Sequence, residues 1–212
     1  MHRGVLLVVA LFLSSTLVPA AAAATTEPRV TPCAAVVPMN EAEFWTIIEK
    51  SRSTYQGIQV RLLEEALSEL KPTSIQSFEM TFIAMMAKSY TWDLWGAAYV
   101  INGGSSDDGF DYFRYWLIAQ GRQVFESALN SPDDLADVIA YPSLNSLRFE
   151  AIREVAEKVW QVKTGKDIDV FMCGMNTRYP QEPVGKPFKD EREHLSKRYP
   201  KLWRRFGELP LF

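Results

Sequence analysis

Apolar residues recur at three- and four-residue spacings along most of this chain, and this periodicity is the feature that most constrains its fold. One clear run is Leu62, Leu63, Ala66, Leu67 and Leu70. Such spacing places the apolar side chains on one face of an α-helix. No stretch shows the sustained alternation of β-branched residues that is typical of strands. The sequence therefore predicts a single compact all-α domain of seven to nine helices.

Helix-start signals divide the periodic segments. Asn40 followed by Glu43 forms a capping-box pattern, which opens a helix by satisfying free amides at its first turn. Thr73 followed by Gln76 repeats the pattern, just after Pro72 ends the preceding helix. In the third helix, Phe and Met residues at helical spacing could line a ligand groove, but a packed core is the favoured interpretation.

The remaining helices are expected at about 91–101, from 106 or 107 to 130 with an interruption at Gly121, from 132, at about 144–164, at 190–198 and from Pro200. Residues 166–188 are rich in Gly and Pro and are expected to be mostly loop. The predicted organisation is a helical core domain at 39–165 and a loop-rich basic extension at 166–212, packed on that core.

The helices expected on either side of residue 103 form a hairpin around which the rest of the chain is organised. We call its turn, residues 102–109, the elbow. Asn102 and the two glycines after it suit a left-handed helix end, and Ser106 or Asp107 is expected to cap the next helix. The candidate ligand-binding residues in and around the elbow are Asp93, Asn102, Asp107, Asp108, Arg114, Trp116 and Arg122.

The carboxylates of this hairpin allow two interpretations. Asp93, Asp107, Asp108 and Asp111 could hold a divalent cation or act in acid–base chemistry, with an arginine orienting an anion. Alternatively they cap and solvate helices, which is the favoured interpretation. The spacing does not match an EF-hand loop. No metal site and no cofactor is assigned.

The first residues are typical of an export signal. A short positive start at His2 and Arg3 precedes an apolar run and a small-residue stretch, the layout of a signal peptide at 1–24. Residues 25–38 are expected to form a flexible arm. The predicted location is periplasmic or secreted, with no stable membrane span after cleavage, because the run is shorter than the roughly 20 residues of a span. An uncleaved anchor, or a true start at Met39, remains open.

An oxidising compartment would give Cys33 and Cys173 the opportunity to pair, but two free thiols are equally compatible with the sequence. After signal cleavage His194 is the remaining histidine. That excludes multi-histidine metal sites and makes a Ser-His-Asp site improbable.

Charge is distributed unevenly along the chain. Residues 39–177 contain 12 Lys and Arg against 20 Asp and Glu, a net charge of −8, whereas residues 178–205 contain 9 against 4, a net of +5. The basic segment could bind an anionic partner, but it is expected to lie across its own acidic domain. Nucleic acid binding is not expected, because the main domain is acidic.

Several motifs resemble those of one bacterial family. They are Met39-Asn-Glu with Phe44-Trp45, the run Trp92-Asp-Leu-Trp-Gly-Ala-Ala-Tyr99, Asp107-Asp-Gly-Phe110 and Phe113-Arg-x-Trp116. In these, the chain is similar to the family catalogued as domain of unknown function 4240 over about 39–164. The resemblance implies an all-α fold and carries no established activity.

Two functional hypotheses follow. The first is an exported binding or interaction module that contacts an unknown protein or a small anionic ligand through the elbow. The second is a carboxylate-dependent, hydrolase-like enzyme that uses a metal at the same place. A pocket in which the aspartates and Arg114 converge would favour the enzyme, and outward-pointing aspartates would favour the binding module.

Overall fold

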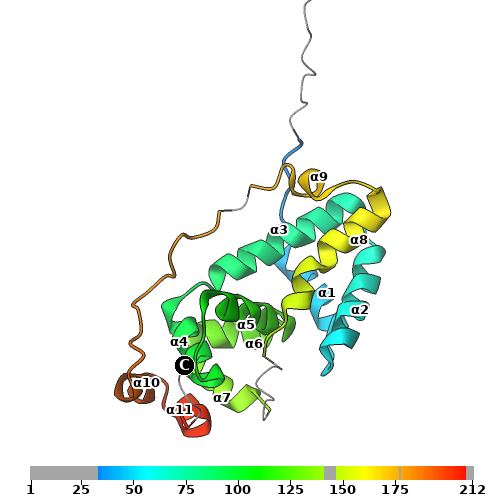
Figure 1. The fold of residues 1–212 in the computed structure, drawn as a ribbon. Coiled ribbons are helices and arrows are strands. Elements are labelled where there is room, and N and C mark those ends of the chain that lie inside the picture. The colour runs from blue at the N-terminus through cyan, green and yellow to red at the C-terminus, as the bar shows by residue number, and fades with distance from the viewer. Residues whose placement is uncertain (1–32, 141–146, 177, 209–212) are drawn as a thin grey trace, which may run out of the picture. The chain divides into compact units, whose positions relative to one another are not determined.

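The computed structural model describes residues 33–140, 147–176 and 178–208, which belong to one compact unit beginning at Cys33. Within these residues eleven α-helices and two short 3-10 helices form, with no strand (Figure 1). The predicted all-α fold is confirmed. The expected signal peptide at 1–24 and most of the expected arm at 25–38 lie outside the described residues.

The α-helices are α1 (Glu41–Ser51), α2 (Gln56–Ser68), α3 (Pro72–Lys88), α4 (Trp92–Asn102), α5 (Asp107–Ala119), α6 (Arg122–Asn130), α7 (Leu135–Val138), α8 (Val155–Thr164), α9 (Ile168–Met172), α10 (Arg192–Arg198) and α11 (Pro200–Phe206). The 3-10 helices are η1 (Pro132–Asp134) and η2 (Glu150–Glu154).

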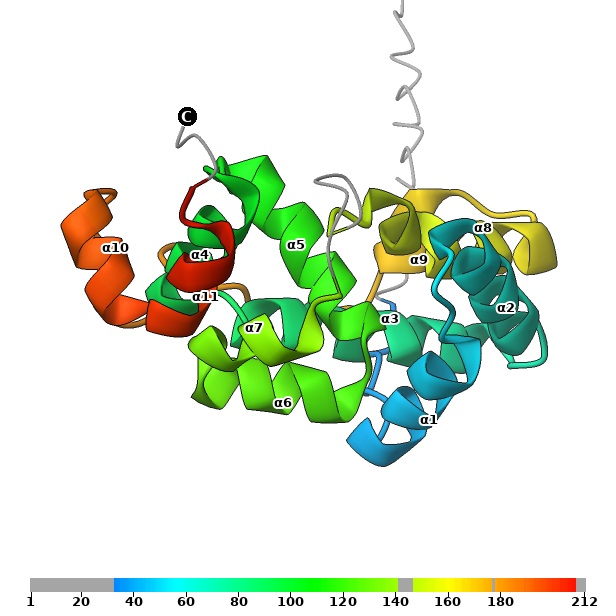
Figure 2. The ribbon, with the colours of Figure 1, turned by 90° about the horizontal axis from the view of Figure 1, so that it is seen from below.

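One end of the core is built on α3, which packs on α1, α5 and α8. Figure 2 shows α2 and α8 side by side at this end. Its centre is aromatic: Phe44 of α1 lies with its ring centroid 4.9 Å from that of Phe78 of α3. Both rings are buried, so the two helices are held by apolar burial of large side chains.

The other end is built on α4 and α5; α11 packs on α4, and α10 packs on α11. Trp95 of α4 stacks on Phe110 of α5 with centroids 5.0 Å apart. The Tyr199 ring lies directly against Gly96 of α4, where a Cβ would collide with it, and its hydroxyl donates to the Asp93 carbonyl at 2.9 Å. The missing side chain of Gly96 is therefore what allows α11 to lie close to α4.

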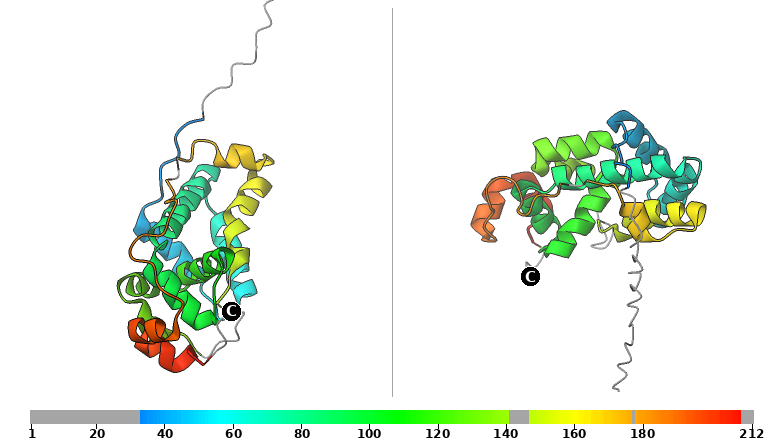
Figure 3. Two further views of the ribbon diagram at one scale, coloured as in Figure 1. Left: turned by 60° about the vertical axis from the view of Figure 1, so that its left-hand side comes forward. Right: turned by 90° about the horizontal axis from the view of Figure 1, so that it is seen from above.

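Between α9 and α10 an extended strap, residues 178–191, crosses the domain (Figure 3). The Val184 amide donates to the Tyr90 carbonyl at 2.9 Å, and the Trp92 amide donates to the Val184 carbonyl at 3.0 Å. Beyond the strap, the basic helices meet acidic residues: Arg198 Nε lies 2.8 Å from Asp93 Oδ1, and Lys201 Nζ lies 2.7 Å from Asp134 Oδ1. The basic segment thus contacts the acidic domain in its own chain.

Cys33 and Cys173 form a disulfide, with Cα atoms 5.7 Å apart and a sequence separation of 140. Next to it, the Val36 amide donates to the Gly174 carbonyl at 2.9 Å. The segment before α1 is therefore fastened to the segment after α9. Among the described helices, none combines the length and apolar character that crossing a bilayer requires.

Two details of the helix prediction are wrong, the cap of the third helix and the number of helices. Thr73 does not cap α3, which starts one residue earlier with Pro72 in its first turn; the Gln76 amide instead donates to the Phe171 carbonyl at 2.7 Å. Residues 166–188 are mostly loop, as the sequence predicts, and contain one short helix, α9. Gly121 adopts a φ of 90° and separates α5 from α6, which is the interruption that the sequence predicts, but the eleven α-helices of the described residues exceed the seven to nine expected.

The prediction of one long helix at about 144–164 is also wrong. Its expected start lies outside the described residues, but Leu147 to Phe149 are not helical and α8 begins only at Val155. Phe149 is buried and its amide donates to the Tyr112 carbonyl of α5 at 3.2 Å. Packing of this segment against α5 therefore replaces the helical hydrogen bonds that its sequence favours.

Candidate functional site

At the elbow, Gly103 closes α4 with a φ of 67°, in the left-handed region that glycine enters without strain. The Ser106 hydroxyl caps α5 by accepting from the Gly109 amide at 3.2 Å. Capping by Asp107, which the sequence left as an alternative, is therefore wrong. Asp107 and Asp108 occupy the first turn of α5 with exposed side chains, where a negative charge favours the helix N-terminus.

The structure does not bring the other candidates together. Asp93 is exposed and pairs with Arg198 of α10. Asn102 is the last residue of α4 and is half-buried. Arg122 begins α6 at the far end of α5, where its Nε lies 2.8 Å from Glu126 Oε1 and its amide donates to Glu49 of α1 at 3.2 Å. Arg122 thus lies at the opposite end of the 13-residue α5 from the elbow, so its expected place there is wrong.

Arg114 is the fully buried charge of this region, with 1% of its surface exposed. Its guanidinium donates to the Met86 carbonyl at 2.6 Å and also contacts the Tyr179 hydroxyl and the Asp111 carboxylate. The same group lies over the Tyr90 ring, 4.7 Å from the centroid. These contacts connect α3, α5 and the start of the strap, so Arg114 is a structural clamp whose donors mostly have partners.

Trp116 is 7% exposed and belongs to the core, as the sequence predicts. Its buried position agrees with packing against Phe113, whose ring centroid is 5.4 Å away. One edge of the indole borders a cavity of about 310 Å³ with Gln59 and Gln120. The Gln59 amide nitrogen donates to the Ala119 carbonyl at 2.9 Å, which occupies this polar group within the fold.

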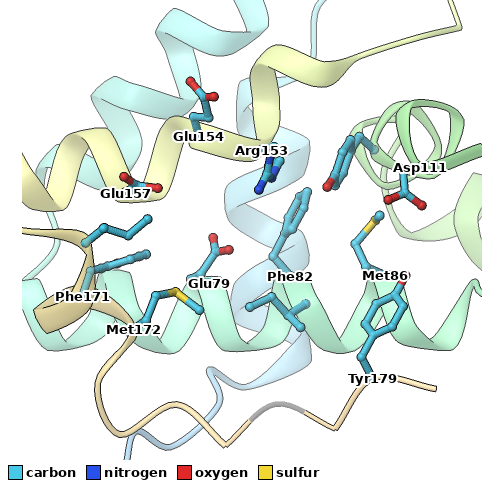
Figure 4. Close-up of a pocket in the computed structure, with 13 residues that line it drawn as sticks. Glu79, Phe82, Met86, Asp111, Arg153, Glu154, Glu157, Phe171, Met172 and Tyr179 are labelled. Carbon is cyan, nitrogen blue, oxygen red and sulfur yellow. The ribbon is translucent and has the colours of Figure 1, made fainter. Parts of the chain in front are cut away.

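A larger cavity, of about 510 Å³, lies away from the elbow between α3, α5, η2, α8, α9 and the strap (Figure 4). We call it the Glu79 pocket. Its charged lining consists of Glu79, Asp111, Arg153, Glu154 and Glu157. Its apolar lining consists of Phe82, Ile83, Met86, Ile168, Phe171 and Met172, and Tyr115 and Tyr179 complete the wall.

Glu79 is positioned by α3 on the same face as Phe82 and Met86, so its carboxyl projects from an apolar wall into the pocket (Figure 4). Burial, reinforced by the charge of Glu157 and opposed by that of Arg153, raises the pKa of Glu79 to about 7. The carboxyl accepts no hydrogen bond from another described residue. An acid that changes charge near neutral pH is thus held in a hollow without a protein partner.

The other charges of the pocket divide into paired and unpaired groups. Glu154 pairs with Lys158 at 3.0 Å, and Asp111 pairs with Arg114. In contrast, the Arg153 guanidinium points into the pocket and forms neither an ion pair nor a hydrogen bond within the described residues (Figure 4). Glu157 accepts only a long bond of 3.3 Å from Gln161. Glu79, Glu157 and Arg153 are therefore the groups free to meet an occupant.

The phenols at one side of the pocket stay protonated. Burial raises the pKa of Tyr115 to about 12, and burial likewise raises the pKa of Tyr179. Both can donate a hydrogen bond at neutral pH but cannot supply a base. The described residues contain no group of three Asp, Glu, His or Cys side chains placed to hold a metal ion. What the pocket offers is an apolar surface with one acid near its titration point and one available cation.

The candidate binding residues that the sequence indicates do not include Glu79, Arg153 or Glu157. A signal was present, because residues 79, 82, 83 and 86 fall on one helical face, and a glutamate interrupts an otherwise apolar stripe. The stripe was interpreted as core, and Phe82 and Met86 are indeed buried. They also form the pocket wall, so the core and groove interpretations both apply to this face.

Comparison with known proteins concerns the segment that contains most of this architecture. A family model described as a protein of unknown function, DUF4240, matches residues 39–162. The chain belongs to the DUF4240 family. The DUF4240 segment includes α1 to α7, most of α8, and the pocket residues Glu79, Arg153 and Glu157, but not α9 or the strap. No curated protein and no solved structure matches the chain.

Proposed function

We propose that this DUF4240 protein is a binding module for a small molecule, which occupies the Glu79 pocket. The observation that carries the proposal is the Glu79 carboxyl, placed in a hollow of about 510 Å³ without a hydrogen-bond partner. The volume falls within the range of about 300 to 1,000 Å³ that is typical of small-molecule sites. A half-buried carboxyl without a protein partner keeps hydrogen-bonding capacity that a ligand in the pocket would use.

The elbow is the weaker candidate for the same function. Its aspartates are exposed, and Asp93 is engaged by Arg198. Arg114, the strongest anion-binding candidate in the sequence, is 1% exposed and already bonded to protein groups. A ligand at the elbow would have to displace these contacts, whereas a ligand in the Glu79 pocket would complete missing ones.

The test is native mass spectrometry of the purified chain beside two tryptophan variants. Ile83→Trp fills the Glu79 pocket from α3, and Val37→Trp places the same side chain at a position that is 71% exposed. We expect a co-purified or added small molecule to bind the natural chain and Val37→Trp but not Ile83→Trp. Equal binding by all three proteins would place the site elsewhere.

The enzyme hypothesis keeps one specific observation in its favour. A carboxyl whose pKa is about 7 is suited to both donating and accepting a proton near neutral pH. Under this second proposal Glu79 is the general acid–base group. Glu79→Gln would then retain bound substrate that the natural chain converts, so the two proteins would carry molecules of different mass. Identical bound molecules would favour the binding module.

We also propose export from the cytoplasm, supported by the order of charged, apolar and small residues at 1–24. Pairing of Cys33 with Cys173 agrees with an oxidising compartment. Mass spectrometry of the native N-terminus should find a chain that begins near Ala23 or Thr25. A native N-terminus at Met39 with recovery from the cytoplasm would contradict export.

A further inference from the structure

We propose that the occupant of the Glu79 pocket is a free α-amino acid with an apolar side chain, its ammonium group held by Glu79 and Glu157 and its carboxylate by Arg153. The inference rests on the proposed binding function and specifies the ligand class. It depends on Glu79 and Arg153, which have no hydrogen-bond or ion-pair partner among the described residues, on Glu157, which accepts only a 3.3 Å bond from Gln161, and on the apolar wall beside them.

The charged groups of the pocket that are not in ion pairs have both signs. The paired groups, Asp111 with Arg114 and Glu154 with Lys158, need no further partner. The remaining groups are two carboxyls and one guanidinium, which face the pocket from α3 on one side and from η2 and α8 on the other (Figure 4). A simple anion would meet two carboxyls, and a simple amine would leave the guanidinium unpaired. A zwitterion satisfies both signs.

The second step concerns geometry at the cation. A guanidinium binds a carboxylate through two parallel hydrogen bonds, which a point charge cannot reproduce. Arg153 retains this capacity because its sequence neighbours do not use it: Glu154 pairs with Lys158, and Glu157 accepts from Gln161. The site therefore presents an intact fork to the ligand carboxylate.

The third step concerns the acid. Without a ligand, burial keeps Glu79 partly protonated near neutral pH, since ionisation in an apolar wall is unfavourable. An ammonium group placed beside it supplies the missing positive charge and favours the ionised form. Glu157, which adds negative potential at the same place, strengthens the attraction for a cation.

The fourth step concerns the remaining volume. Phe82, Ile83, Met86, Phe171 and Met172 form an apolar surface beside the charged groups. Burying a Leu, Met or Phe side chain there contributes roughly 1.5 to 3 kcal/mol relative to leaving it in water. Flexible Met side chains on two elements allow the wall to adapt to more than one such side chain. The pocket therefore favours apolar over polar amino acids.

The experiment is calorimetric titration of the disulfide-intact chain with L-leucine, L-methionine and L-phenylalanine. Two analogues of leucine, each lacking one charged group, are 3-methylbutylamine and 4-methylpentanoate. We expect binding of at least one of the amino acids and a loss of tenfold or more with either leucine analogue, because each leaves a charge of the pocket unpaired. Equal affinity for leucine and for the amine would overturn the role of Arg153.

The variants Arg153→Gln, Glu79→Gln and Glu157→Gln each remove one of the three groups. We expect each to weaken amino acid binding tenfold or more, with Arg153→Lys only partly restoring it. The matched controls Arg61→Gln and Glu65→Gln alter an exposed ion pair of α2 outside the pocket and should bind as the natural chain does. Thermal unfolding of every variant verifies that it is folded, and unchanged binding by folded Arg153→Gln would overturn the proposal.

The outcome also separates this inference from the proposed function. If no amino acid binds at millimolar concentration but Ile83→Trp still removes another bound molecule, the ligand class is wrong and the binding module stands. If Ile83→Trp removes nothing and no amino acid binds, both proposals fail.

Discussion

The elbow and the Glu79 pocket both contain several carboxylates, but those of the elbow are exposed to solvent and Glu79 is not. The elbow aspartates come from consecutive positions, lie in the first turn of α5 and face water. In the pocket, Glu79 and Glu157 come from α3 and α8, which are separated by more than sixty residues and meet only through packing. A carboxyl in water is satisfied by solvent, whereas one in an apolar hollow depends on what else enters it. A cluster of acidic residues in the sequence is therefore weaker evidence for a binding site than a single carboxyl that folding removes from water.

The largest expected effect concerns the buried clamp between the two regions. Arg114→Ala should lower the free energy of unfolding by about 3 to 4 kcal/mol, because it empties a space among aromatic rings and removes the shorter of two hydrogen bonds to the Met86 carbonyl. Urea unfolding measures the change. Arg122→Ala, at a position nearly half exposed, is the control and should leave the free energy of unfolding nearly unchanged. An equal loss of stability in the two variants would show that the contacts of Arg114 do not stabilise the fold more than those of Arg122.

The free energy of unfolding should depend on pH through Glu79 of the pocket. Below pH 4.5 Glu79 is protonated in both the folded and unfolded chain, so Glu79→Gln should leave stability nearly unchanged. Between 4.5 and about 7 the unfolded chain releases this proton while the folded chain retains it, so the natural protein loses stability as pH rises. At pH 8 Glu79→Gln should therefore be more stable by roughly 2 to 3 kcal/mol.

Urea midpoints of both proteins at pH 4.5 and pH 8 measure this difference. Glu65→Gln, on the exposed face of α2, is the matched control and should follow the natural chain at both values. A stability difference between Glu79→Gln and the natural chain that does not vary with pH would mean that the carboxyl is solvated, and the contrast with the elbow would disappear.

A third, smaller effect tests the assignment of the cap at the elbow. Ser106→Ala removes the hydroxyl that accepts from the Gly109 amide and should cost about 1 kcal/mol. Thermal or urea unfolding at neutral pH detects this change. Ser105→Ala, one residue earlier, provides the comparison, because the Ser105 hydroxyl only donates a 3.4 Å bond to the Ser106 carbonyl.

The smallest expected effect is at the aspartate next to that cap. Asp107→Asn removes a charge that interacts with the start of α5 but breaks no hydrogen bond of a cap, so the loss should be about 0.5 kcal/mol or less. Salt should reduce it further, since the side chain is exposed. A larger loss of stability, or a loss of ligand binding in folded protein, would favour the elbow over the Glu79 pocket as the binding site.

Local patterns predicted much of the fold because they act over a few residues. Asn40 caps α1 through the Ala42 amide at 2.8 Å, Gly103 closes α4, and α11 begins at Pro200, all as the sequence indicates. The failures have non-local causes. Gln76 turns to the Phe171 carbonyl 95 residues away, and Phe149 packs on α5 in place of extending α8. Propensity is overridden where a distant element offers a better contact.

The site was harder to predict for the same reason. Glu79 alone has the pattern of a charge on an apolar helical face, which can equally be a residue at the edge of a core. Its significance comes from Arg153 and Glu157, which no local spacing relates to it. The elbow, in contrast, was conspicuous because its polar residues are adjacent in sequence, which is what helix ends require.

The close fit of Tyr199 on Gly96 has a consequence for the order in which this chain completes its fold. The Tyr199 hydroxyl bonds to a carbonyl 106 residues earlier, and the last helices bury Leu202 and Phe206. All three lie beyond residue 162, where the family match ends. During synthesis the face of α4 that α11 covers therefore stays exposed until residues 199–206 have emerged. Contacts of such long separation are slow to form, so closure of this interface should be among the late kinetic events of folding.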